Sequence, residues 1–271
     1  MQRIFRIIDR ARRFLAFKVI REESFLSVQR NALVGFHKLL WILKNSPFAA
    51  AFSDSDISKA ISQSRSQLGQ DVFALSFAGT QKSGFFVEFG ATDGKSLSNT
   101  FLLEQHFGWT GILCEPARTW LPELKKNRAA KIDTRCVYSS SETKVNFLEM
   151  EIGELSTIEG FGEDDEHSLT REVNHSFEVK TVTLLDLLNY HDAPKYIDFL
   201  SIDTEGSEFE ILNVFDFSQY SFGAIAVEHN YSATREKVRA LLLSHGYRQV
   251  YPELSDFDDW FVLATNQNIP A

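Results

Sequence analysis

From residue 84 onward, short apolar runs alternate with longer segments in which apolar residues recur every three or four positions. The apolar runs are typical of buried strands, and the periodic segments are typical of amphipathic helices. The expected strands span residues 85–90, 110–116, 132–140, 144–150, 177–184, 196–203, 223–230, 247–251 and 260–265. The expected helices span residues 96–107, 118–127, 185–191, 207–215 and 235–246. This alternation predicts an α/β fold with a parallel sheet covered on both faces and a terminal pair of strands.

The pattern before residue 84 is helical. Residues 1–45 have apolar positions at helical spacing, with arginines on the opposite face. Residues 46–55 are typical of a linker, and one further helix is expected over residues 56–75. The sequence therefore predicts a basic amphipathic helical extension, residues 1–55, followed by one main domain, residues 56–271.

Charge is distributed unevenly along the chain. Residues 1–45 hold ten Lys and Arg against three acidic residues, whereas the net charge of the whole chain is −9, so residues 46–271 carry −16. An acidic surface repels phosphate backbones, and we therefore expect no nucleic-acid partner. The basic extension is expected to pack on the main domain, to join a second subunit in a homo-oligomer, or to lie on an anionic membrane surface.

Other features of the sequence bear on the cellular compartment of the protein. No run of eighteen apolar residues is present, so we expect no membrane-spanning helix. The basic and apolar residues at the start of the chain are interleaved, unlike those of a secretory signal. The two cysteines, Cys114 and Cys136, lie in apolar runs and are expected to be buried thiols of a reduced compartment. We expect a cytoplasmic protein, with peripheral membrane association as the alternative.

The first strand ends in an unusual turn, FFVEFGATDGKS. Gly90 and Gly94 bracket it, and glycine lets the backbone bend sharply and approach a ligand. The spacing fits neither a dinucleotide fingerprint, which would need a glycine near Thr92, nor a phosphate-binding P-loop. Glu115 ends the second strand, where a carboxylate can accept both hydroxyls of a ribose. The pair of strand ends predicts a site for an adenosine-like ligand without a pyrophosphate cradle.

Acidic residues also gather at the next two strand ends. Asp203 ends the strand at 196–203, and Glu205 and Glu208 come directly after it. Glu228 and His229 lie at the end of the strand at 223–230. Carboxyl ends of parallel strands share one edge of a sheet. We therefore expect these side chains to line one crevice, as ligands of a divalent cation or as a general base.

Five motifs in this order resemble the FkbM-type methyltransferases, which use S-adenosylmethionine. They are SQLGQDVFAL, FFVEFGATDG, WTGILCEP, FLSIDTEGSEFEIL and AVEHN. The resemblance covers residues 65–265 and implies a Rossmann-like class I methyltransferase sheet with a terminal antiparallel strand pair. It leaves residues 1–55 outside.

The resemblance implies cofactor contacts for the first two strand ends. The turn that would face the methionine part of S-adenosylmethionine consists of Glu88, Gly90, Ala91, Thr92, Asp93 and Gly94. Relatives often have Asn in place of Thr92. Glu115 would hold the ribose. Many relatives carry an acid near the adenine, where this chain has Ser139 and its neighbours.

The resemblance also implies the reaction centre. Asp203 and Glu205 would lie there, with Glu228 and His229 opposite. Asp203, Glu205 and His229 are the expected catalytic residues, and Asp203, Glu228 and His229 are the expected ligands if Mg²⁺ is used. The loop at residues 151–177 is expected to fold over the crevice as a lid, with His167 and His175 at its flanks.

The function implied is methyl transfer to a hydroxyl group, expected on a sugar, a glycan or another small molecule. Two alternatives stay open. A nicotinamide-dependent oxidoreductase would share the fold, but this sequence lacks the glycine spacing that binds a dinucleotide. A non-catalytic binding module would keep the fold and tether a partner through the basic extension.

Overall fold

The computed structural model describes residues 35, 37–79, 83–162 and 171–264. The chain divides into two compact units, Met1–Trp41 and Ile42–Ala271. Most of the basic extension, including the helix expected near its start, lies outside the described residues. Residues 42–55, which the sequence assigns to the extension, fall within the second unit. None of the helices in the described ranges is both long enough and apolar enough to cross a membrane.

The core of the second unit is a seven-stranded sheet in the order β10-β11-β9-β8-β1-β2-β3. Its strands are β1 Phe85–Phe89, β2 Thr110–Cys114, β3 Lys131–Asp133, β8 Tyr196–Ile202, β9 Ser221–Glu228, β10 Tyr247–Val250 and β11 Asp258–Leu263. Strands β3, β2, β1, β8 and β9 are parallel, whereas β11 is antiparallel to both β9 and β10. The expected Rossmann-like α/β fold with a terminal antiparallel pair is confirmed. The chain order reverses between β1 and β8, which is where open α/β sheets bind ligands.

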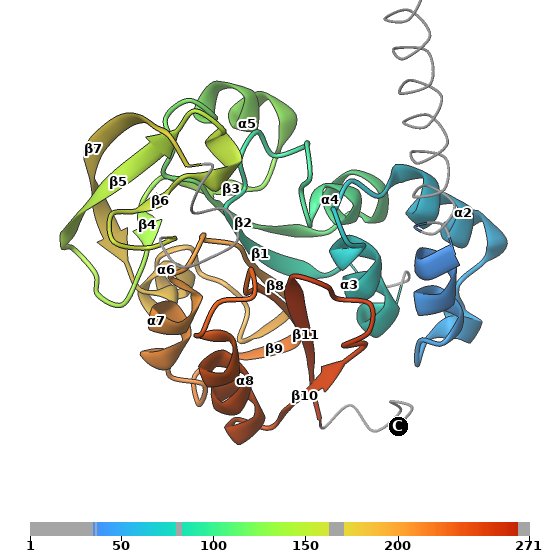
Figure 1. The fold of residues 1–271 in the computed structure, drawn as a ribbon. Coiled ribbons are helices and arrows are strands. Elements are labelled where there is room, and N and C mark those ends of the chain that lie inside the picture. Colours follow the sequence, from blue (N-terminus) through green and yellow to red (C-terminus); the bar gives the residue numbers. More distant parts are fainter. Residues whose placement is uncertain (1–34, 36, 80–82, 163–170, 265–271) are drawn as a thin grey trace, which may run out of the picture. The chain divides into compact units, whose positions relative to one another are not determined.

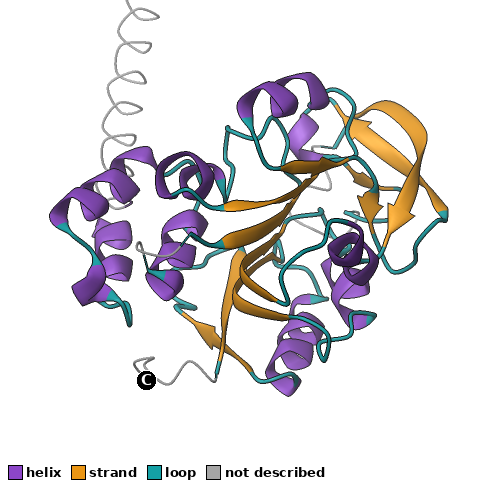
Figure 2. Cartoon of the chain, turned by 180° about the vertical axis from the view of Figure 1, so that it is seen from behind, coloured by secondary structure: helices purple, strands orange, loops and turns teal. Residues whose placement is uncertain are grey.

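Helices cover both faces of this sheet (Figures 1 and 2). They are α2 Asp54–Gln63, α3 Gln70–Ala78, α4 Phe101–Phe107, α5 Leu121–Asn127, α6 Leu184–Tyr190, α7 Glu208–Asn213 and α8 Arg235–Ser244, with a 3-10 turn η1 at Ala49–Ala51. On one face, Leu187 of α6, Ile211 of α7 and Leu242 of α8 join the main apolar cluster. On the other face, Phe73 of α3 stacks on Trp260 of β11 with ring centroids 4.8 Å apart.

Two expected helices are shorter in the structure. The helix expected over residues 56–75 is split into α2 and α3, because the buried carboxylate of Asp71 accepts hydrogen bonds from Ser64 Oγ, Ser66 Oγ and the Arg65 N–H. Gly69 then takes a left-handed conformation with φ 88°. The helix expected over residues 96–107 begins only at Phe101, because residues 98–100 bind a buried carboxylate of β1.

A second sheet of four strands is inserted between β3 and α6, in the order β4-β7-β5-β6. Its strands are β4 Cys136–Val137, β5 Lys144–Met150, β6 Thr157–Ile158 and β7 Val173–Val182, with a 3-10 turn η2 at Gly153–Leu155. The strand expected over residues 132–140 is therefore divided between the two sheets. The expected lid over residues 151–177 is partly regular structure, because it includes η2, β6 and the start of β7. His175 is an exposed residue of β7, and His167 lies outside the described residues.

Candidate active site

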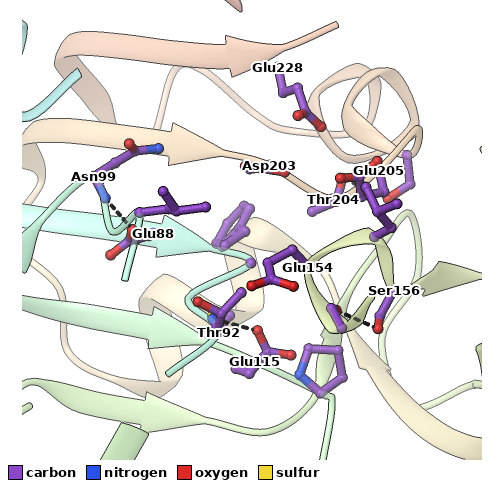
Figure 3. Close-up of a pocket in the computed structure, with 18 of the residues that line it drawn as sticks. Glu88, Thr92, Asn99, Glu115, Glu154, Ser156, Asp203, Thr204, Glu205 and Glu228 are labelled. Carbon is purple, nitrogen blue, oxygen red and sulfur yellow. Dashed lines mark hydrogen bonds between the residues drawn. The ribbon is translucent and has the colours of Figure 1, made fainter. Parts of the chain in front are cut away.

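A pocket of about 260 Å³ opens at the carboxyl ends of β1, β2, β8 and β9 (Figure 3). One wall comes from these strand ends and the turns that follow them. The opposite wall comes from the second sheet, through Phe147 of β5, Ile158 of β6 and the segment between them. The pocket therefore lies at the switch point of the main sheet, and the inserted sheet encloses it.

The turn after β1 requires glycine where it meets β8. Gly90 has φ +71°, and a Cβ placed on it would lie 2.2 Å from the backbone oxygen of Asp203. Any side chain at this position would force the loops after β1 and β8 apart. Thr92 follows in the same turn with φ 45°, a conformation that non-glycine residues rarely adopt. Such strain is typical of functional sites, where the surrounding structure holds it in place.

Glu88 anchors the segment that lines the floor of the pocket. Its carboxylate accepts hydrogen bonds from the Asn99 N–H at 2.7 Å and from the hydroxyls of Ser98 and Thr100. The guanidinium of Arg128 lies 3.6 Å away. Burial nevertheless raises the pKa of Glu88 above its usual value. Because so many of its hydrogen-bonding positions are used within the protein, Glu88 mainly shapes the pocket.

Glu115 at the end of β2 fixes the strained turn. Its two carboxylate oxygens accept hydrogen bonds from the Thr92 N–H at 2.7 Å and from the Ala117 N–H at 2.8 Å. Burial raises the pKa of Glu115 to about 7 despite these two bonds. Each oxygen keeps a further lone pair, and the side chain lines the pocket. Glu115 can therefore accept ligand hydroxyl groups while it holds Thr92.

Asp203, Glu205 and Glu228 form a carboxylate cluster at the ends of β8 and β9, with one oxygen of each within 4.8 Å of the others. Burial raises the pKa of Asp203 to about 7. Burial and the charge of Asp203 raise the pKa of Glu205 to about 8. The pKa of Glu228 lies well above its usual value for the same two reasons. Three neighbouring carboxyl groups cannot all ionise without a counter-charge, and such groups are suited to holding or moving a proton.

Two side chains from the inserted region hold Glu205. The guanidinium of Arg171 pairs with the Glu205 carboxylate. The hydroxyl of Thr157 on β6 donates to the Glu205 backbone oxygen at 3.0 Å. Glu205 has φ 58°, and its neighbour in the pocket, Asn230, has φ 41°. The cluster is thus held in a strained backbone by contacts from both sheets.

The structure brings together seven of the expected site residues. The pocket is lined by Glu88, Gly90, Thr92, Glu115, Asp203, Glu205 and Glu228. Ala91, Asp93, Gly94, Ser139 and His229 do not line it. The Asp93 carboxylate accepts the N–H groups of Lys95 and Ser96, and Gly94 packs against Arg128, so both stabilise the turn from behind. In place of Ser139, the β4 residues Cys136 and Val137 line the pocket.

His229 differs most from the expectation. Its Nδ1 accepts the Tyr231 N–H at 3.0 Å, and its Nε2 lies 3.1 Å from the backbone oxygen of Asp258. Both ring nitrogens are therefore used by the protein backbone, and burial lowers the pKa of the imidazole. In the strand expected over residues 223–230, side chains alternate between the two faces, so Asn230 is expected on the same face as Glu228. That alternation was available in the sequence and identifies Asn230, which lines the pocket.

Comparisons with known proteins agree with this geometry. The strand order, the site at the switch point and the strained glycine turn define a Rossmann-like ligand-binding enzyme fold. A family model described as the methyltransferase FkbM domain matches residues 88–249, and the chain belongs to this methyltransferase family. Its members generally use S-adenosylmethionine.

Comparisons at the level of whole chains add little. Among solved structures, the chain is similar to precorrin-6y C5,15-methyltransferase from Geobacter metallireducens GS-15, with 14% sequence identity and a TM-score of 0.36. The match covers 66% of this chain and 71% of that chain. No curated protein matches the chain.

Proposed function

We propose that the protein transfers the methyl group of S-adenosylmethionine to a hydroxyl group of a sugar or glycan. The observation that carries the proposal is the shared pocket. It joins the Gly90 turn and Glu115, which suit an adenosine-like ligand, to the Asp203 cluster, which suits proton removal.

The charge of the pocket fits this cofactor. Six carboxylates line it, and among its described lining residues there is no Lys, Arg or His; the acids are Glu88, Glu115, Glu154, Asp203, Glu205 and Glu228. S-adenosylmethionine carries a positive sulfonium and a positive ammonium group against one carboxylate, so the molecule is net positive and such a pocket attracts it. A nicotinamide dinucleotide carries a negative pyrophosphate, which the same carboxylates would repel. The electrostatics therefore favour methyl transfer over the oxidoreductase alternative.

Each part of the cofactor has residues to hold it. Glu115 offers acceptor oxygens for the ribose hydroxyls. Gly90 and Thr92 of the turn after β1 line the pocket where the methionine part would lie. The apolar edges of Cys136 and Val137 suit the adenine ring. Glu154 and Ser156 face the pocket from the inserted sheet and would contact the acceptor (Figure 3).

The chemistry favours oxygen as the acceptor atom. When bound, S-adenosylmethionine supplies an electrophilic methyl group, and the acceptor must lose its proton as the new bond forms. Asp203 is placed to take that proton, and its pKa of about 7 leaves it partly ionised near neutral pH. Burial raises the thiol pKa of Cys114 well above its usual value and that of Cys136 to about 12, so neither thiol competes as a nucleophile.

A transfer assay tests the proposal. The full-length protein is incubated with S-adenosylmethionine carrying a labelled methyl group and a panel of neutral sugars and glycans, and products are identified by mass. We expect a gain of one methyl group on oxygen, which is lost in Asp203→Asn. Transfer to nitrogen or carbon would contradict the hydroxyl acceptor. Cofactor binding without transfer to any of these acceptors would favour the binding-module alternative.

A further inference from the structure

The carboxylate cluster has the dimensions of a cation site. One oxygen each from Asp203, Glu205 and Glu228 lies within 4.8 Å of the others. Hard divalent cations bind oxygen at about 2.0–2.6 Å, so opposite ligands in their coordination shell lie about 4–5 Å apart. Figure 3 shows Glu228 reaching from the end of β9 toward the segment after β8 that carries Asp203 and Glu205. The spacing requires little movement to enclose one ion.

Glu228 provides a second observation. Glu228 is 8% exposed, and its Oε2 has no hydrogen-bond partner among the described residues. Figure 3 shows its carboxylate directed toward Asp203 and Glu205. An unpartnered buried carboxylate oxygen is costly, because it has lost its water without gaining a donor. A cation among the three side chains supplies the missing partner.

The local charge is also matched to a divalent ion. Arg171 and the side-chain amide of Asn230 both contact Oε2 of Glu205, the latter at 3.4 Å. These contacts neutralise one carboxylate and leave Glu205 Oε1 for another ligand. The two remaining carboxylates, Asp203 and Glu228, carry two negative charges when ionised, and one divalent cation would balance them. No basic side chain lines this pocket among the described residues.

We propose that Asp203, Glu205 and Glu228 bind one hard divalent cation, such as Mg²⁺, Mn²⁺ or Ca²⁺. This ligand set differs from the expected Asp203, Glu228 and His229, because both ring nitrogens of His229 are engaged elsewhere. A set made only of oxygen ligands favours these cations over zinc. Three carboxylates leave coordination positions open for two neighbouring hydroxyls of an acceptor. This last consequence rests on the proposed function, whereas cation binding itself does not.

Calorimetry with MnCl₂ tests the site directly. The full-length protein is stripped with a chelator and titrated with Mn²⁺ in the absence of cofactor, and the bound ion is confirmed by electron paramagnetic resonance. We expect one Mn²⁺ per chain, competed by Mg²⁺ or Ca²⁺. Asp203→Asn and Glu228→Gln should each weaken binding by about tenfold or more.

Glu210→Gln is the matched control, because Glu210 Oε2 is also buried without a partner but belongs to α7 and not to the cluster. Its Mn²⁺ affinity should stay unchanged. Circular dichroism and S-adenosylhomocysteine binding show whether each variant is folded, and either cluster variant suffices for the test. The proposal fails if Mn²⁺, Mg²⁺ and Ca²⁺ do not bind at millimolar concentration, or if the folded cluster variants bind as the wild type does. Methyl transfer by a protein that binds no cation would overturn this inference and leave the proposed function intact.

Discussion

Glu115→Gln is the sharpest test of the cofactor site. Glutamine has the same shape, but an NH₂ group replaces one carboxylate oxygen, and the charge is lost. In the wild type the two oxygens accept the N–H groups of Thr92 and Ala117 at 2.7 and 2.8 Å. Only one of these bonds survives, and a ribose bound as proposed would lose a charged acceptor. The turn after β1 and the ribose contact are therefore weakened together.

The size of the effect follows from these contacts. A hydrogen bond to a charged group contributes about 1.5–3 kcal/mol, which corresponds to a loss of about 10- to 150-fold in affinity for S-adenosylhomocysteine.

The pKa of Glu115 adds a pH signature. It is raised to about 7, so the ionised fraction falls from about nine tenths at pH 8 to about one tenth at pH 6. The wild-type affinity should accordingly weaken by about tenfold as pH falls over this range, and Glu115→Gln should remove this component.

The assay is isothermal titration calorimetry with S-adenosylhomocysteine at pH 6, 7 and 8. Glu149→Gln is the control, because Glu149 is also buried and accepts a backbone N–H, that of Thr119 at 2.9 Å, but does not line the pocket. An equal loss in both variants would point to a general structural effect. Unchanged affinity in Glu115→Gln would refute the ribose assignment.

Three further predictions follow from the geometry. Gly90→Ala should abolish S-adenosylhomocysteine binding in calorimetry, because the new Cβ would lie 2.2 Å from the Asp203 backbone oxygen. Gly246→Ala is the control and should bind normally, because Gly246 also has a positive φ but has open space around it. Asp203→Asn should lose methyl transfer while keeping its affinity for the cofactor. Folded His229→Gln should keep methyl transfer, because both ring nitrogens of His229 are bound by the backbone. Loss of methyl transfer in His229→Gln would restore the histidine as a candidate base. In metal-free protein, the free energy of unfolding measured with urea should fall as pH rises from about 4.5 to about 8. The reason is that the folded state raises the pKa of Glu205 and so binds its proton more tightly than the unfolded chain does. Glu205→Gln should flatten this pH dependence, and an unchanged slope would contradict the assignment.

The central sheet was predictable because its strands are buried on both faces. Continuous apolar runs such as Phe85–Phe89 and Tyr196–Ile202 mark such strands in the sequence. The second sheet was not predictable as a unit, since its strands are partly exposed. The first part of β7, Val173–Val182, is largely solvent-exposed and gives no apolar run. The split between α2 and α3 depends on Asp71 capturing Ser64 and Ser66, a side-chain preference that helical spacing does not reveal.

The site was predictable where it depends on strand ends. Glu115 and Asp203 follow parallel strands, and topology alone places them at one edge of the sheet. The wall supplied by the inserted sheet was not predictable, because it depends on contacts between distant segments. Arg171 is an example: its guanidinium pairs with Glu205, which lies 34 positions later in the chain, and nothing in the local sequence indicates that pairing.

The two walls of the pocket are fixed by different parts of the fold, and this division bears on specificity. Glu115 secures the turn after β1 through Thr92 within the main sheet, on the side where the cofactor is proposed to bind. The acidic cluster is also held from the inserted sheet, because Arg171 and Thr157 both bind Glu205. A change in the inserted sheet can therefore reposition Glu205 and reshape the acceptor side while the Glu115 contacts stay intact. Under the proposed function, acceptor choice can diverge while the turn held by Glu115 stays constant, because Glu115 belongs to the main sheet and Thr157 to the inserted one.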